Sequence, residues 1–388
     1  MNSDSSPSSR SKFTLLFGYH RASLTGLAFA GLAIVIHYFL HNPYLATLAA
    51  AISIALLSLT VSEIAEVLAE RLEEPYGSFV LTFSAVVVEI ILLFMILLTA
   101  SQTAGAMDTV KGGIISAVIV DMNVLLGLAV FIGGLAFKEQ EHNEDTSSTY
   151  TTILLVASSA LLVPSILHHT NRSEQDLLAS SIIIAFVLFV FYIIIFIFQT
   201  RTHSHFFKST ARSRIFRYKR RLEQGDEEDA DDYDIFDTLT TGWNFALLFI
   251  LIAIIGFAAE VFAFEGMKLV DTYHFPVGLA GLIIAIISVA PEIVTAVKAA
   301  KNDQIQRVVN IAMGASTASI MLAVPILMAL SFFTAEPLTL DFNTLQIGAL
   351  ILTIILAWKT TDDGYTNYFE GTSHLIFFVC YAIITAFH

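Results

Sequence analysis

Long apolar runs alternate with short polar connections along almost the whole chain. Eleven of these runs are long enough to cross a hydrocarbon core of ~30 Å as a helix. They cover residues 22–40, 44–68, 77–100, 112–136, 150–168, 178–199, 243–270, 276–299, 306–333, 339–358 and 371–387. The pattern predicts an all-α protein that crosses a membrane eleven times.

The composition agrees with this interpretation. Of the 388 residues, 56% are hydrophobic and only 14% are charged. A soluble protein of this length needs more polar surface, so the chain belongs with polytopic membrane proteins. The first apolar run is too long for the core of a signal peptide, and we expect it to remain as a span.

The basic residues segregate strongly between the two sets of loops. If each Lys and Arg is assigned to its nearest connection, 17 lie on the side of the N-terminus and 3 on the other, which accounts for all 20. Because cytoplasmic loops are rich in Lys and Arg, this distribution predicts a cytoplasmic N-terminus and an external C-terminus. The expected location is a bacterial inner membrane.

The longest connection, residues 200–242, has two parts of opposite charge. Residues 201–221 are basic and suited to contact with anionic lipid, whereas residues 222–237 are densely acidic. The acidic part is either a solvated linker or a segment that attracts cations. It lacks the glycine and the terminal glutamate that an EF-hand loop requires.

The chain also contains an internal repeat. Residues 108–134 align without a gap with residues 303–329, and each stretch follows a helix that carries a central glutamate. Spans two to six and seven to eleven form two sets of five. Since five is odd, the two sets enter the membrane in opposite senses. We therefore divide the chain into an N-terminal tail with an extra first span (1–43), a first repeat (44–199), a loop (200–242) and a second repeat (243–388).

The two central glutamates are the strongest candidates for chemistry. Glu89 and Glu292 are each the single charge in the middle of a span, where a carboxylate costs about 2.5–3.5 kcal/mol. In an inverted repeat they meet near mid-membrane. Two such carboxylates share protons or hold a cation, which is the exchange element of a cation/proton antiporter. Ca²⁺ compensates two negative charges with hard oxygen ligands. The alternative is a pair of protonated, purely structural glutamates.

Residues on the same two helices extend this candidate site. Pro291 has no N–H to donate to the carbonyl of Ile287, and a freed carbonyl is a cation ligand. An ordinary proline kink is the alternative. Ser84 and Ser288 precede the two glutamates and could add hydroxyl ligands, although serine is common in membrane helices.

The helices that follow the glutamates carry small and polar side chains. Asp121 and Asn123 lie in the first, and Ser316, Thr317 and Ser319 lie in the matching part of the second. They complete an ion shell or shape a gate, while close helix packing is the alternative role of the hydroxyl residues. Asp121 lies deep in an apolar span and needs a partner there.

Two further acids lie on the helices that precede the central glutamates. Glu63 and Glu260 occupy comparable places and are candidates for a proton path or an entry vestibule. The histidines that the sequence scatters along the spans show no metal-ligand spacing on a shared helix face, and we assign them no role.

Several of these stretches together resemble a known family. They are residues 74–90, 123–134 and 287–325 with the acidic loop, and the likeness covers essentially the whole chain. The chain resembles the calcium/proton antiporter (CAX) family of the cation/calcium exchanger superfamily, especially its bacterial calcium or sodium-potassium/proton branch. The resemblance implies Glu89 and Glu292 as central ion-binding carboxylates, with Glu63 and Glu260 as acids of the flanking helices.

The chain departs from the common family pattern in ways that leave the ion open. Ala85-Val86-Val87 and Val289-Ala290-Pro291 replace the usual Gly-Asn-Ala, and Ala318 replaces a glutamine of many eukaryotic relatives. The missing amides remove possible ligands, so Na⁺ or K⁺ stays an alternative to Ca²⁺.

The sequence thus predicts a secondary antiporter that exports Ca²⁺ in exchange for H⁺ by alternating access. An Na⁺(K⁺)/H⁺ antiporter of the same fold is the nearest alternative, and a cation channel is a further one. We expect no enzymatic activity, because neither Gly-x-Ser-x-Gly nor His-Glu-x-x-His occurs. We expect no cofactor and no nucleic-acid partner. The expected partners are membrane lipid, the transported cations and, in a homo-oligomer, further copies of the chain.

Overall fold

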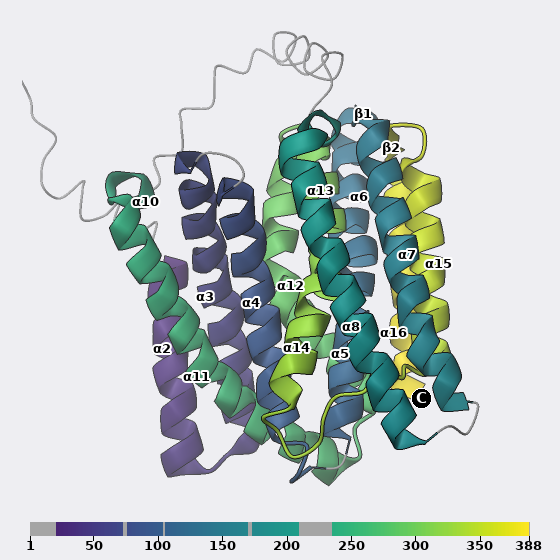
Figure 1. Ribbon diagram of the computed structural model, residues 1–388. Coiled ribbons are helices and arrows are strands. Elements are labelled where there is room, and N and C mark those ends of the chain that lie inside the picture. The colour runs from purple at the N-terminus through teal and green to yellow at the C-terminus, as the bar shows by residue number, and fades with distance from the viewer. Residues whose placement is uncertain (1–20, 73–75, 104, 170–172, 209–234, 388) are drawn as a thin grey trace, which may run out of the picture.

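The computed structural model describes residues 21–72, 76–103, 105–169, 173–208 and 235–387. Helices account for nearly all of this chain (Figure 1). In the first half they are α2 (Arg21–Val35) with the π-helix η1 (Ile36–Leu40), α3 (Pro43–Arg71), α4 (Tyr76–Leu98), α5 (Ala106–Val120), η2 (Asp121–Leu125), α6 (Leu126–Phe137), α7 (Glu144–His169), α8 (Glu174–Ile197), η3 (Phe198–Thr202) and η4 (Ser204–Phe207). In the second half they are α10 (Ile235–Thr238), α11 (Thr241–Tyr273), α12 (Val277–Lys301), α13 (Ile305–Ala318), η5 (Ser319–Ala323), α14 (Val324–Ser331), α15 (Thr344–Thr361) and α16 (Tyr368–Phe387).

Each of the eleven predicted spans falls on one helix or on consecutive helices, although span 339–358 begins five residues before α15. Within the described residues, ten helices are long and apolar enough to cross a membrane, and α4 adds the shorter apolar stretch 82–98. The predicted all-α membrane fold is confirmed. The acidic part of the long loop and the N-terminal tail fall largely outside the described residues.

Local signals in the sequence fix where several helices begin. The side chain of Asn42 accepts a hydrogen bond of 3.2 Å from the Leu45 amide, and Pro43 occupies the first helical position of α3. Asn343 and Gln346 form a reciprocal capping box at the start of α15. These caps satisfy amides that the first turn of a helix leaves without partners.

A small antiparallel sheet joins the two halves, although the sequence predicted no strand. It pairs β1 (Glu139–Glu141) with β2 (Tyr365–Asn367), with Gln140 opposite Thr366. β1 follows α6 and β2 precedes α16, so the sheet ties the first half to the last helix. We call this end of the bundle the strand face and the other end, where the C-terminus lies, the opposite face (Figure 1).

Contacts between loops agree with the predicted alternation of the spans. On the strand face, Arg71 donates to the Leu239 carbonyl at 2.6 Å, and Gln140 donates to Asp303 at 2.9 Å. Each pair joins loops that the basic-residue distribution assigned to one side. On the opposite face, the pair Lys111–Asp341 joins loops assigned to the other side, with 2.6 Å between nitrogen and oxygen.

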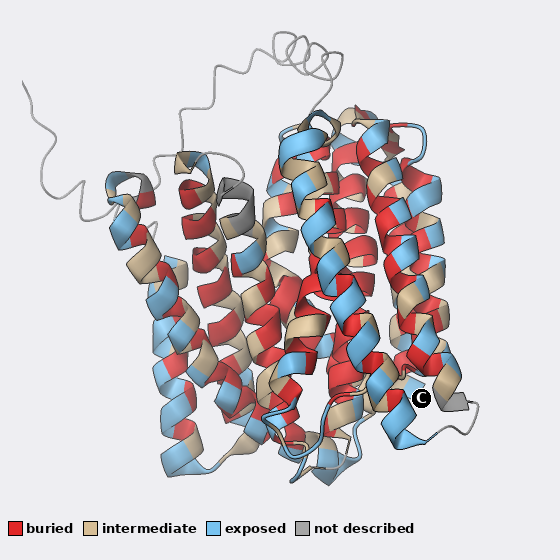
Figure 2. Cartoon of the chain, viewed as in Figure 1, coloured by how far each residue is buried: buried red, intermediate tan, exposed pale blue. Residues whose placement is uncertain are grey.

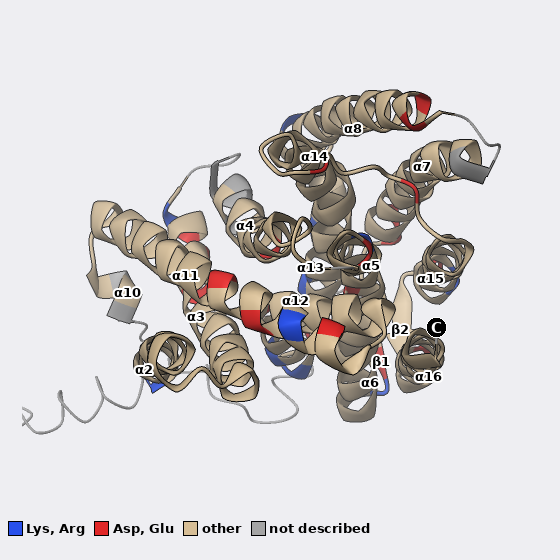
Figure 3. Ribbon diagram, turned by 90° about the horizontal axis from the view of Figure 1, so that it is seen from below, with Lys and Arg blue, Asp and Glu red and all other residues tan. Residues whose placement is uncertain are grey.

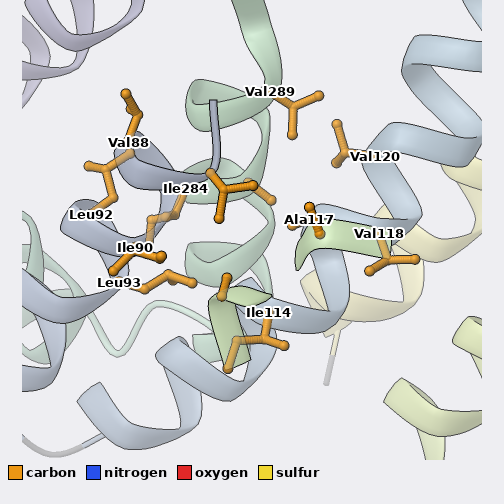
Figure 4. Close-up of a cluster of buried hydrophobic side chains, with 14 of the residues drawn as sticks. Val88, Ile90, Leu92, Leu93, Ile114, Ala117, Val118, Val120, Ile284 and Val289 are labelled. Atoms are coloured by element: carbon orange, nitrogen blue, oxygen red, sulfur yellow. The ribbon is translucent and has the colours of Figure 1, made fainter. Parts of the chain in front are cut away.

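The core lies where the two halves cross. α12 packs against α3, α4, α5, α6 and α13, and Figure 3 shows it near the centre of the bundle in the view along the helices. Glycine permits α12 to pack closely against α5, because a Cβ on Gly281 of α12 would lie 2.6 Å from the Gly113 nitrogen of α5. Around this crossing, apolar side chains of α4, α5 and α12 meet, including Val88, Ile114 and Ile284 (Figure 4).

The outer helices present apolar side chains to their surroundings. In α8, Ile183 and Phe186 are exposed, as are Phe249 and Phe257 in α11. Buried residues concentrate on the inward faces and in the central helices (Figure 2). A bundle with an apolar exterior is the arrangement that a lipid environment stabilises.

Candidate ion-binding site

Two five-residue π-helices lie at corresponding places in the two halves. η2 connects α5 to α6, and η5 connects α13 to α14. Each therefore interrupts the helix that follows a glutamate-bearing helix. π-helices of this length inside α-helices are rare and occur frequently at functional sites.

The two π-helices begin at positions that the ungapped alignment of the repeats does not pair. The ungapped alignment placed Asp121 opposite Ser316. In the structure, Asp121 is the first residue of η2 and Ser319 is the first residue of η5. The starts of the two π-helices are therefore offset by three residues from that alignment.

Glu89 lies on α4, which packs against η5 of the other half. Its side chain is buried, and the Ser319 hydroxyl donates a hydrogen bond of 2.7 Å to Oε2. Within the described residues, Oε1 is buried without a hydrogen-bond partner. A buried carboxylate oxygen in this condition calls for a proton or a cation.

Asp121 repeats this arrangement in η2, which packs against α12. It is buried, and the Ser316 hydroxyl donates to Oδ2 at 3.1 Å. Oδ1 has no partner within the described residues. The Asp121 carboxylate interacts electrostatically with both Glu292 and Glu89. Asp121 is therefore a third acid of the site, and it is buried like Glu89.

Glu292 differs from these two acids because it lines a cavity. The cavity has a volume of about 470 Å³, and Glu292 is half-buried beside it. Ser84, Ser288 and Pro291 line the same space, which extends to Glu66 on the strand face. Arg307 donates to Glu66 at that end, where both side chains are partly exposed. The cavity thus connects Glu292 with the strand face.

The predicted supporting residues behave in different ways. Ser288 donates to the Ala285 carbonyl at 3.0 Å within its own helix, and α12 continues through Pro291 without a break. The Asn123 amide nitrogen does not donate to the acids of the site. It donates to the Ile119 carbonyl at 3.1 Å and to the Thr353 hydroxyl at 3.0 Å. Asn123 therefore supports the helix and is not arranged as an ion ligand.

The two flanking acids are not brought to this centre. Glu63 is half-buried on α3 beside Ser62, which lines the cavity, so its role in a proton path stays a prediction. Glu260 is exposed on α11, on the same outer side as Phe257 and Phe264. Its position gives no support to a role at the site.

From the sequence, Ser319 is expected to complete an ion shell, to shape a gate or to pack between helices, and neither its hydrogen bond to Glu89 nor the π-helices are predicted. The position of a helical widening depends on packing between the halves, which hydropathy does not report. The acids of the site come close enough to interact, but they do not form a closed coordination shell. Within the described residues, no group of three or more His, Cys, Asp or Glu side chains is placed to hold a metal ion.

Comparison with known proteins gives matches over the same parts of the chain. The sodium/calcium exchanger protein family matches residues 42–201 and 243–387. The sodium-potassium/proton antiporter ChaA of Escherichia coli is 28% identical over 92% of this chain and 94% of its own length. The Ca²⁺/H⁺ antiporter of Aphanothece halophytica is 22% identical over 77% of this chain and 79% of its own length.

Solved structures agree on the fold. Native YfkE superposes with a TM-score of 0.75 at 18% identity, covering 95% of this chain and 100% of that one. The H⁺/Ca²⁺ exchanger CAX superposes with a TM-score of 0.65 at 16% identity, covering 97% of this chain and 91% of that one. The family match covers well over half of the sequence, and the resemblance seen in the sequence is confirmed. The chain belongs to the sodium/calcium exchanger protein family.

Proposed function

We propose that this protein is a secondary active antiporter that exchanges Ca²⁺ for H⁺ at Glu89, Glu292 and Asp121. One observation carries the proposal. Two of these buried carboxylates, Glu89 and Asp121, each have one oxygen held by a serine hydroxyl and the other oxygen without a hydrogen-bond partner in the described structure. Such oxygens are stable when a proton or a cation is bound, which is the competition that an antiporter needs.

The cavity supplies the entry route in the proposed cycle. A hydrated cation reaches Glu292 from the strand face and displaces protons from the acids. Rearrangement of the two repeats then closes this cavity and opens a path to the opposite face. Protons return by the same site, because their binding neutralises the carboxylates and releases the cation. Neither ion needs a cofactor or an enzymatic step.

A divalent ion suits three interacting carboxylates better than a monovalent ion. A bound cation offsets the electrostatic repulsion between the carboxylates. With its double charge, Ca²⁺ offsets twice as much of this repulsion as Na⁺ or K⁺. The names of the relatives include both Ca²⁺/H⁺ and sodium-potassium/proton antiporters. Na⁺(K⁺)/H⁺ exchange on the same residues is therefore the second candidate, and it requires only a change in the ion that the acids prefer.

The orientation follows from the charge distribution. The loops of the strand face belong to the set to which the sequence assigns 17 of the 20 basic residues, so we assign this face to the cytoplasm of a bacterial inner membrane. The N-terminus then lies in the cytoplasm. We therefore propose that this arrangement faces the cytoplasm and that export begins with uptake of cytoplasmic Ca²⁺ into the cavity.

The proposal is tested by cation-driven proton release from inverted membrane vesicles with an acidified interior. Ca²⁺, Na⁺ and K⁺ are added in turn, and a fluorescent pH probe follows the gradient. We expect Ca²⁺ to dissipate the gradient and Glu89→Gln or Glu292→Gln to abolish the response. Glu260→Gln, a matched change of an acid on the outer surface, is expected to keep it.

Each outcome separates the alternatives. A response to Na⁺ or K⁺ alone would retain the site and replace the substrate. Full transport by either central glutamine variant would contradict the proposed role of the two glutamates. Cation flux without any proton movement would favour a channel.

A further inference from the structure

A buried histidine that the mechanism does not use lies next to the Asp121 π-helix. His374 on α16 is buried, and its Nδ1 lies 3.0 Å from Asn123 Oδ1. Its Nε2 lies 2.8 Å from the Thr360 hydroxyl on α15. Both ring nitrogens are thus engaged in the interior, and one of them contacts η2 two residues from Asp121.

The network around Asn123 determines how these groups are oriented. The Nδ2 atom faces the Ile119 carbonyl, which can only accept, so Nδ2 is correctly placed as the donor. Oδ1 then faces His374, whose Nδ1 must carry a proton and donate it. In the neutral ring Nε2 is left as an acceptor, and the Thr360 hydroxyl donates its one proton to Nε2 at 2.8 Å in place of the Leu356 carbonyl at 3.0 Å. His374 therefore fixes the amide of Asn123 in one orientation.

The same amide stabilises the widened turn itself. Its second donated bond goes to Thr353 on α15 at 3.0 Å, and all of these groups are buried. Asn123 thus links η2 to both α15 and α16. A π-helix departs from the regular hydrogen-bond ladder, so side-chain donors to nearby carbonyls help to hold it.

Close packing of the backbone leaves His374 little freedom. A Cβ on Gly127 of α6 would lie 2.7 Å from the Cβ of His374, and a Cβ on Gly371 would overlap the backbone of Phe131. α16 therefore approaches α6 as closely as glycine allows, directly beside the histidine. Packing of α16 against α6 therefore holds the imidazole ring beside Asn123.

We infer that His374 is a positioning residue for the ion site, which holds Asn123 and thereby the π-helix that carries Asp121. The inference rests on the proposed function, because it concerns the cation that Asp121 helps to bind. The opposite half is built differently, since the middle of η5 consists of the buried apolar residues Ile320, Met321 and Leu322. The described η5 therefore has no amide side chain at the place that Asn123 holds in η2.

Two substitutions separate the two contacts of the ring. In His374→Asn, the new side-chain amide nitrogen lies where Nδ1 was, so the donor to Asn123 is kept. In His374→Gln, the new amide nitrogen lies where Nε2 was, so the donor to Asn123 is lost. We expect His374→Asn to transport Ca²⁺ with a half-saturation constant within about twofold of the parent protein. His374→Gln is expected to raise this constant roughly tenfold, with a smaller change in maximal rate.

Thr353→Val tests the same clamp from α15 and does not alter the histidine. It removes the acceptor for Asn123 Nδ2 and is expected to raise the half-saturation constant in the same direction. Combining it with His374→Gln should give less than the product of the two single effects, because both act through one amide. Thermal unfolding of each purified variant reports on folding separately.

The outcomes distinguish this inference from the proposed function. If Glu292→Gln abolishes transport while His374→Gln and Thr353→Val keep the parent half-saturation constant, the clamp is wrong and the antiporter stands. If the variants lose thermal stability with no change in this constant, His374 is only structural and the inference is overturned. Normal transport by Glu292→Gln would contradict the proposed function, whatever His374 does.

Discussion

The two central glutamates differ in their access to solvent. From the strand face, a cavity of about 470 Å³ reaches Glu292 between α4, α12 and α13. Glu89, at the corresponding place in the other half, is buried and held by Ser319. Two halves that repeat one another in sequence thus give their glutamates unequal access to water. An inverted repeat that works by alternating access must be asymmetric in this way in any single state.

Ion pairs at the two faces show the same contrast. Lys111 and Asp341 on the opposite face are 10% and 15% exposed, and Thr339 lies 3.2 Å from the Lys111 nitrogen. Arg307 and Glu66, at the mouth of the cavity, are 46% and 30% exposed. The opposite face therefore carries a largely buried charge pair, whereas the mouth of the cavity carries a pair that water screens.

The largest effect should follow from breaking the buried pair. Asp341→Asn leaves the Lys111 ammonium in a poorly solvated position without its counter-charge. We expect the free energy of unfolding to fall by about 3–5 kcal/mol. A lower midpoint of thermal unfolding in detergent measures this loss. Glu66→Gln is the matched control at the mouth of the cavity, where removal of a screened ion pair should lower the free energy of unfolding by less than about 1 kcal/mol.

The same pair has a predictable response to pH. Burial raises the pKa of Asp341, but the hydrogen bonds from Lys111 and Thr339 and the Lys111 charge outweigh burial, so the net pKa lies below the ordinary value. The stabilisation is therefore complete above the ordinary Asp pKa of ~3.9 and is lost as the pH falls through the lowered value. The difference between parent and Asp341→Asn should stay constant from neutral pH down to about pH 5. A difference that vanishes well above that pH would contradict the pairing.

The second effect concerns the unequal access of the two glutamates. A water-soluble carbodiimide with an amine nucleophile, added to inverted vesicles, reaches carboxylates that face the cavity. Glu89 reacts only when the surrounding helices open, so we expect Glu292 to be modified at least about tenfold faster. Peptide mass spectrometry measures both rates, and Asp362, which is exposed at the strand face, serves as a reference. Ca²⁺ should slow the reaction at Glu292, and equal rates at the two sites would refute an inward-facing state.

The comparison also shows how far sequence reasoning reaches. Hydropathy and basic-residue counts predicted the spans and their relative sides, because the membrane imposes both on each segment separately. The cost of a charge at mid-membrane was enough to single out Glu89, Glu292 and Asp121. These features depend on the residue and its depth, not on its neighbours.

Features that depend on packing between the halves were not predictable in this way. The register of η5, and hence the pairing of Ser319 with Glu89, is set by contact between α4 and α13–α14. His374 gave no signal, since a lone histidine in an apolar span has no partner until α16 is placed against α6. The short sheet is likewise formed by segments more than 200 residues apart.

The smallest effect should come from the hydroxyl that distinguishes Glu89. Ser319→Ala leaves both carboxylate oxygens of Glu89 without a donor, so the ionised form, which we propose binds the cation, is less stable. We expect the half-saturation constant for Ca²⁺ to rise about three- to tenfold, because one hydrogen bond to a charged group is lost. Ser319→Thr keeps the hydroxyl and should remain close to the parent. Ser331→Ala removes a buried serine that donates only to Met328 in its own helix, and it should leave the constant unchanged. If Ser319→Ala binds Ca²⁺ as the parent protein does, Ca²⁺ binding by Glu89 does not depend on η5. The packing of each glutamate-bearing helix against the π-helix of the other half is then structural only.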